Sequence, residues 1–203
     1  AGDGAVVYNP NVAANSRLDG PFTVGNLIRT GANSQTITHL GVQDVGDSGA
    51  PNADGFVGGN VDVGIWSADG STLLGSASVG SSDQLLDTYR YAELATALTL
   101  DPNTDYLIGA LVGNGHEYFL DTGSASSSAF LAGTDFTLLE NRFNAGGVLA
   151  APLNDGTLAV GRWAPANAIF IEPVPEPATI AIWSLLGSVA LGFGWRRATR
   201  LRK

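Results

Sequence analysis

The stretch VDVGIWSADGSTLLGSASV, residues 61–79, decides the fold. Val61, Val63 and Ile65 occupy alternate positions, so all three fall on one face of an extended chain. Asp69-Gly70 follows them, and a second apolar run then returns. An Asp-Gly pair between two such runs is a strong signal for a tight turn that joins antiparallel strands. This stretch therefore predicts a β-hairpin.

Similar strand patterns flank the hairpin on both sides. Upstream, QTITHLGVQDV, which begins at Gln35, has the alternating pattern of a strand: Thr38, Leu40 and Val42 fall on one face. The turn DPNT, residues 101–104, predicts a second hairpin that joins its two flanking runs. A short apolar piece near the beginning of the chain is interpreted as a lead-in or an edge strand. The remaining strand candidates lie at residues 5–8, 89–94, 98–100, 105–113 and 168–171.

The composition favours many short strands joined by turns. The chain has 203 residues, of which 27 are Gly and 9 are Pro, and 44% are hydrophobic. The high Gly content argues against a helical bundle, and the high hydrophobic fraction argues against disorder. We predict an all-β fold, an antiparallel β-sandwich of jelly-roll type. Its expected parts are a lead-in at 1–20, the sandwich at 21–172, a Pro-rich hinge at 173–177 and a transmembrane helix with a basic tail at 178–203.

The chain contains neither Cys nor Met. A disulfide framework and a thiolate metal site are therefore excluded. Because the chain begins Ala1-Gly2-Asp3, we expect that a translated start has been removed, most economically with a signal peptide.

Charge is divided unevenly along the chain. Residues 1–172 carry five Arg and 18 acidic residues, a net charge of −13, whereas residues 173–203 carry a net charge of +4. An acidic body disfavours nucleic acid as a partner, because phosphates require Lys and Arg. The basic residues of the tail are Arg196, Arg197, Arg200, Arg202 and Lys203.

The tail has the pattern of a membrane segment. Ala178 to Trp195 is 18 residues without a charge. As a helix this length spans about 27 Å, close to the hydrocarbon thickness of a bilayer. The basic cluster behind it predicts the cytoplasmic side, which places the body outside. The alternative, a buried helix of the folded body, is disfavoured by the Pro-rich spacer before it and the Arg block after it.

The end of the chain resembles a known sorting signal. Val174, Pro175, Glu176 and Pro177, one apolar segment and a terminal Arg-rich end together resemble the PEP-CTERM signal. The resemblance implies export by a Gram-negative-type bacterium. It also implies recognition by an exosortase-type membrane protease, transient residence in the inner membrane, and removal of the tail near Pro-Glu-Pro. A final place at the cell surface or in the extracellular matrix would follow.

The body carries a second resemblance. ITHLGVQDVGDSG, VDVGIWSADGSTLLGSASV and YRYAELATALTLDPNTDYLIGALVG resemble an uncharacterised bacterial surface domain over residues 22–120. The resemblance implies a β-sandwich and no known activity. This chain departs from the expected pattern in a longer acidic loop, which contains Ala50-Pro51-Asn52.

That acidic loop offers a candidate calcium site. Asp44, Asp47, Asn52 and Asp54 supply three carboxylates and an amide oxygen within eleven residues. Calcium prefers six to eight such oxygens. The alternative is that Asp, Asn and Gly here only build turns, and both interpretations stay open at this point.

Catalytic signals are weak, and aromatic residues offer a second candidate. His39 and His116 are the only histidines, and G-x-S-x-G and H-E-x-x-H motifs are absent. Jelly-roll domains often bind glycans, and exposed aromatic rings can stack on the sugars. The alternative is that these rings pack in the core. The candidates for glycan contact are Trp66, Tyr89, Tyr91 and Tyr118, and Trp163 is a further member of the group.

These patterns lead us to expect a non-enzymatic, exported protein of the cell surface or of an exopolysaccharide or biofilm matrix. One alternative is a carbohydrate-binding module for exopolysaccharide, which would need an exposed aromatic strip. A second is a glycan-active enzyme, which would need two carboxylates converging on an open groove. We expect no cofactor other than the calcium considered above.

Overall fold

The computed structural model describes residues 5–6, 15–17, 20–44, 59–86, 89–113, 118–121, 136–156, 162–163 and 166–171. Every regular element within these ranges is a β-strand. A helix able to cross a membrane is not found among them. The all-β, antiparallel fold class predicted from the sequence is confirmed. The helix predicted within 178–203 lies outside the described residues.

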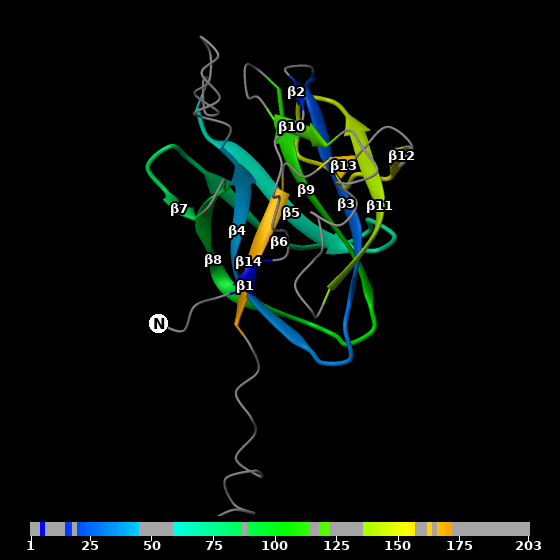
Figure 1. Ribbon diagram of the computed structural model, residues 1–203. Coiled ribbons are helices and arrows are strands. Elements are labelled where there is room, and N and C mark those ends of the chain that lie inside the picture. The colour runs from blue at the N-terminus through cyan, green and yellow to red at the C-terminus, as the bar shows by residue number, and fades with distance from the viewer. Residues whose placement is uncertain are drawn as a thin grey trace, which may run out of the picture. The chain divides into compact units, whose positions relative to one another are not determined.

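The strands form two larger sheets and a small third one (Figure 1). The five-stranded sheet has the order β1-β14-β4-β8-β7, and the six-stranded sheet has the order β12-β11-β3-β9-β5-β6. The three-stranded sheet has the order β13-β10-β2. The strands are β1 (Ala5–Val6), β2 (Asn15–Arg17), β3 (Phe22–Thr30), β4 (Gln35–Gln43), β5 (Val61–Ser67), β6 (Leu73–Val79), β7 (Gln84–Leu86), β8 (Tyr89–Leu100), β9 (Asp105–Val112), β10 (Tyr118–Asp121), β11 (Phe136–Ala145), β12 (Asn154–Gly156), β13 (Arg162–Trp163) and β14 (Ala166–Ile171).

One hydrophobic core joins the two larger sheets. The alternation read in β5 is real, because Val61, Val63 and Ile65 are all buried in this core. Leu40 and Val42 of β4 enter the same cluster from the opposite sheet. Each such side chain contributes about 1.5–3 kcal/mol when it is fully buried. Residues 1–172 form one compact unit and residues 173–203 another, so the core and every described strand belong to a single body.

The predicted hairpin at residues 61–79 is confirmed as β5 and β6. Its turn is closed by Gly70 N–H donating to Ser67 O at 2.8 Å, and Gly70 has a φ of 70°. Asp69 Oδ1 accepts hydrogen bonds from Ser67 Oγ at 2.6 Å and from Ser71 N at 3.1 Å. The bonds from Ser67 and then Ser71 lower the pKa of the Asp69 carboxyl. The Asp69 carboxylate thus stabilises the turn by hydrogen bonds to the residues on both sides of it.

The second predicted hairpin is wrong. β8 pairs with β4 and β7 in the five-stranded sheet, whereas β9 pairs with β3 and β5 in the six-stranded sheet. The turn between them crosses from one sheet to the other. Asn103 N–H donates to Gly31 O at 2.8 Å, and Thr30 N–H donates to Thr104 O at 3.0 Å. A turn sequence predicts a reversal of the chain, but only packing decides which strands pair.

A row of glycines crosses the six-stranded sheet. Gly25 of β3 lies opposite Gly109 of β9, which lies opposite Gly64 of β5. A Cβ at Gly64 would come within 2.6 Å of the Trp66 ring, and one at Gly109 would come within 3.1 Å of Pro152. The row therefore lets bulky groups lie close against the sheet.

The segment 146–153, here called the outer strap, covers this face. Ala151 of the strap packs with Trp66 and Leu107 in a second, smaller cluster. The strap is held by Ala150 N–H donating to Thr23 Oγ1 at 3.2 Å and by Asn144 Nδ2 donating to Ala151 O at 3.1 Å. The six-stranded sheet is thus buried on both faces near Trp66.

Replacing Gly25 with Ala should destabilise the body by at least about 1–3 kcal/mol, the usual cost of overpacking. An added Cβ would lie far inside van der Waals contact with the backbone of Ile108, which cannot move without shifting β9. Gly75→Ala is the matched control, because its Cβ would meet Leu94 Cδ2 at an ordinary 3.4 Å. Urea unfolding of residues 1–172 measures both; equal stability of the two variants would contradict the expectation.

Candidate functional site

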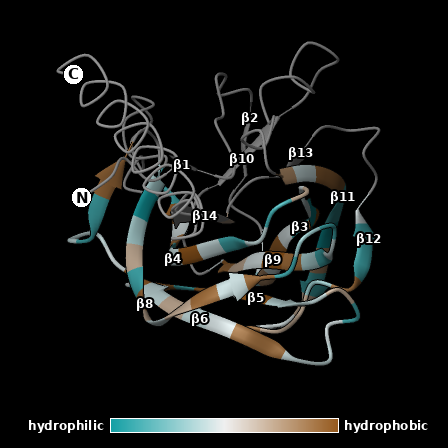
Figure 2. Ribbon diagram, turned by 90° about the horizontal axis from the view of Figure 1, so that it is seen from below, coloured by the Kyte–Doolittle hydropathy of each residue, from teal (hydrophilic) through white to brown (hydrophobic). Residues whose placement is uncertain are grey.

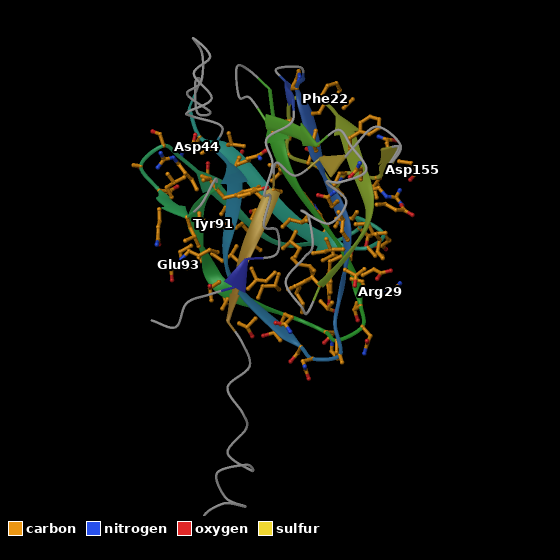
Figure 3. The ribbon with its side chains drawn as sticks, viewed as in Figure 1. Phe22, Arg29, Asp44, Tyr91, Glu93 and Asp155 are labelled. Carbon is orange, nitrogen blue, oxygen red and sulfur yellow. The ribbon has the colours of Figure 1, made fainter. Side chains whose placement is uncertain are left out.

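The best-defined charged site lies at the base of the acidic loop. Asp44 follows β4 directly, and its Oδ2 accepts a hydrogen bond from Arg90 Nε at 2.5 Å. The Asp44 and Arg90 side chains are only 9% and 22% exposed. Arg90 Nη1 also donates to Asp83 O at 3.0 Å. Figure 3 labels Asp44 at the end of its strand. One arginine thus ties the loop to the turn at residues 80–83.

The other end of the loop meets the same turn. Asn60 lies against Gly80, since a Cβ there would come within 2.6 Å of Asn60 Oδ1. Gly80 N–H donates to Asp83 Oδ2 at 2.8 Å. Asp44 and Asn60, which begin and end the loop, therefore both lie beside residues 80–83, and Asp44 is held there through its ion pair with Arg90.

The remaining candidate calcium ligands, Asp47, Asn52 and Asp54, lie outside the described residues. Within the described ranges no three His, Asp or Glu side chains gather as metal ligands would. Asp44 already faces a guanidinium, and a cation beside Arg90 would be repelled. The described residues do not test the calcium site, and of the two interpretations of the loop the contact with Arg90 favours turn building, because it weakens the contribution of Asp44 to a metal site.

The structure does not gather the aromatic candidates into one strip. Trp66 is 4% exposed and lies under the outer strap. Tyr89 and Tyr91 of β8 are 1% and 3% exposed, with ring centroids 6.1 Å apart. The Tyr91 ring lies over Gly41 of β4, because a Cβ there would meet its Cδ1 at 2.5 Å. Rings buried to this degree offer no free face, so sugar stacking would require their surroundings to open.

Tyr118 and Trp163 belong to the three-stranded sheet. Tyr118 of β10 lies opposite Arg17 of β2, and Trp163 of β13 lies opposite Leu120. Their side chains lie outside the described part of the structure. Of the histidines, His39 pairs its Nδ1 with Thr38 Oγ1 at 2.9 Å on β4, and His116 is not among the described residues.

Other carboxylates of the body are engaged in ion pairs with arginine. Arg29 holds Asp105 through two bonds, Nε to Oδ1 at 2.5 Å and Nη2 to Oδ2 at 2.8 Å. Arg142 pairs with both Glu140 and Asp155. Figure 3 labels Arg29 and Asp155 on strands of the six-stranded sheet. The pairs Arg29–Asp105 and Arg142–Asp155 connect neighbouring strands, whereas Arg142 and Glu140 both belong to β11. The sequence patterns did not predict the cross-strand pairs because the pairing of strands was not yet known.

Comparison with known proteins identifies one segment. Residues 173–198 match the PEP-CTERM protein-sorting motif. The match contains Val174, Pro175, Glu176 and Pro177 together with Arg196 and Arg197, so the resemblance predicted from the sequence is confirmed. No curated protein sequence matches the chain. The motif indicates an exported protein that is sorted through the membrane by an exosortase.

Replacing Arg90 with Met should destabilise the body by roughly 2–3 kcal/mol, because a largely buried charged hydrogen bond is lost. The matched control is Arg29→Met, which breaks a pair whose arginine side chain is 51% exposed and should destabilise the body clearly less, because solvent screens an exposed ion pair. Denaturant unfolding distinguishes the two. A larger effect for Arg29→Met would contradict the role assigned to the loop base.

Millimolar calcium should leave the thermal midpoint of residues 1–172 unchanged, since Arg90 already neutralises Asp44. A filled site at a hundred times its Kd would instead add about 2.7 kcal/mol. Magnesium at equal ionic strength is the control for screening. Two results together would support the calcium site: a thermal midpoint raised by calcium and not by magnesium, and no such rise in the variant Asp47→Asn/Asp54→Asn.

Proposed function

We propose that the body, once exported, is a non-enzymatic structural component of the cell surface or of an exopolysaccharide or biofilm matrix. The observation that carries this proposal is the joining of a PEP-CTERM sorting motif to a separate β-sandwich. The motif occupies residues 173–198, and the compact body ends at residue 172. Removal of the tail at the Pro-Glu-Pro region would therefore leave the sandwich intact.

The use of charged side chains supports a structural role. Asp44, Asp105 and Asp155 face arginines, and Asp69 organises a turn. A hydrolase that acts on glycans needs two carboxylates free to act as acid and base or nucleophile. In the described residues these four carboxylates are committed to holding strands and turns.

We assign the sandwich to the jelly-roll type. β1-β14-β4-β8 are neighbours in one sheet, and β3-β9-β5-β6 are neighbours in the other. These eight strands alternate between the sheets along the chain, except at the β5–β6 hairpin. Two Greek-key windings in two sheets support that assignment. β7, β11 and β12 extend the edges.

Carbohydrate binding is the second candidate. It is favoured by Tyr89 and Tyr91, which are adjacent aromatic rings on one strand. Their burial means that a polysaccharide would have to uncover them. A structural role without sugar stacking needs no such change, and we therefore place it first.

Expression in an exosortase-containing bacterium tests the proposal. The full chain should appear outside the cell shortened by its tail, whereas Pro175→Ala/Glu176→Ala/Pro177→Ala should stay unshortened in the membrane fraction. Gly75→Ala, in the body, is the control and should be processed normally. Mass spectrometry of the exported protein reports the outcome.

The second arm mixes residues 1–172 with extracted exopolysaccharide. We expect co-sedimentation with an unchanged polymer length. A shortened polymer would establish a glycan-active enzyme and overturn the non-enzymatic role. Absence of the shortened protein from the matrix of the producing strain would overturn the matrix role.

A further inference from the structure

The outer strand of the six-stranded sheet has an unprotected edge. β6 pairs with β5 on one side, and among the described strands nothing pairs with its other side. Its sequence, LLGSASV, contains no charge and no Pro. In Figure 2 the ribbon of β6 runs from white to brown, the colours of uncharged and apolar residues. Natural edge strands usually carry a charge, a Pro or a bulge, or are very short, because a free edge invites pairing.

The regular part of this edge is Gly75–Val79. The pairing with β5 is irregular between Gly75 and Leu73 and regular from Gly75 onward. The other described sheet edges differ. β1, β7 and β12 span two or three residues each, and β12 carries the exposed Asp155. β8 and β11 are also unpaired by described strands on their outer sides, over Ala92–Leu100 and Phe136–Glu140, but these stretches carry the charged residues Glu93 and Glu140. Among the described edges of the two larger sheets, β6 therefore combines a regular run of five residues with the absence of any charge.

Exposed apolar side chains occur on the two edge strands β6 and β7. Five large hydrophobic residues are exposed in the described structure, and three of them belong to β6 and β7. Leu73 is 50% exposed, Leu85 is 51% exposed and Leu86 is 36% exposed. β7 follows β6 across a short turn and forms the edge of the other sheet. The two edges thus combine apolar surface with backbone groups that no described strand pairs.

We propose that β6 pairs antiparallel with β6 of a second copy, about a twofold axis at Ala77. Ser76 and Ser78 are exposed, whereas Val79 is in the core and Ala77 packs against it. Side chains alternate in a strand, so outward residues must lie opposite outward residues. Centring the pair on Ala77 places Ser76 opposite the other copy's Ser78 and uses the whole regular run.

Charge restricts where two copies of the body can meet. The body carries a net charge of −13, so two copies repel each other over most of their surface. In the proposed register no charged residue of one β6 lies opposite the other β6, and small hydroxyl side chains face each other across the axis. Cross-strand Ser and Thr pairs are compatible with close pairing and hydrogen bonding. We therefore take as the occupant another molecule of the same chain, because the twofold register is self-complementary, and the pairing extends the six-stranded sheet.

Sedimentation equilibrium of residues 1–172, the unit that holds the whole described core, tests this pairing. The wild-type fragment should be a dimer in equilibrium with its monomer. Ser76→Lys/Ser78→Lys places Lys opposite Lys twice per dimer and should raise the dimer Kd at least about tenfold, because directly opposed like charges repel. Ser76→Glu/Ser78→Lys places Glu opposite Lys twice and should restore dimerisation.

Asn33→Lys/Ser34→Lys is the matched control. It adds the same charge at exposed positions between β3 and β4 and should leave the dimer intact. Thermal midpoints confirm that each variant is folded, and the Glu/Lys variant keeps the test valid if the double-Lys variant fails to fold. A fragment that stays monomeric at millimolar concentration overturns the proposal. So does a dimer whose Kd is insensitive to the double-Lys change, or one that Glu/Lys does not restore.

Discussion

The fold depends on the register of three adjacent strands, β3, β9 and β5. Gly25, Gly109 and Gly64 meet at one level of this ladder. The same register brings Val24, Ala110 and Val63 together on the inward face. A one-residue slip would exchange the two faces and expose the core. The glycines also leave room for Trp66 and the outer strap, so a single alignment organises both the main core and the smaller cluster behind it.

The charges of the body serve this architecture. Arg29, Arg90 and Arg142 each hold acidic groups from elsewhere in the chain or sheet. The body is strongly acidic, and these three arginines are placed where they fix strand pairs and the base of the acidic loop. The sorting motif at residues 173–198 indicates that this body is exported.

Local sequence patterns predicted where strands and turns lie better than they predicted which strands pair. The alternation in β5 and the Asp-Gly turn identified the hairpin correctly, because both signals act between residues close in sequence. β3 was not predicted, since Asn26 interrupts its inward apolar face; its Nδ2 donates to Asn141 Oδ1 at 3.1 Å, and both residues are fully buried. The DPNT turn suggested a hairpin where the chain changes sheets. The aromatic candidates are spread over three sheets, because residues near each other in sequence need not share a surface. The sorting tail could be predicted from the sequence because its signal is linear and needs no partner strand.

The position of β14 has a consequence for the order of events during export. β14 lies between β1 and β4, so the last strand before the hinge is hydrogen-bonded on both sides. The five-stranded sheet can therefore be completed only when residues 166–171, the last strand of the body, are free to pair. A force exerted through the tail would act along two hydrogen-bonded ladders at once, rather than peel a strand from an edge. The last strand of the body is thus needed to finish its fold, and it is hydrogen-bonded on both sides once the sheet is complete.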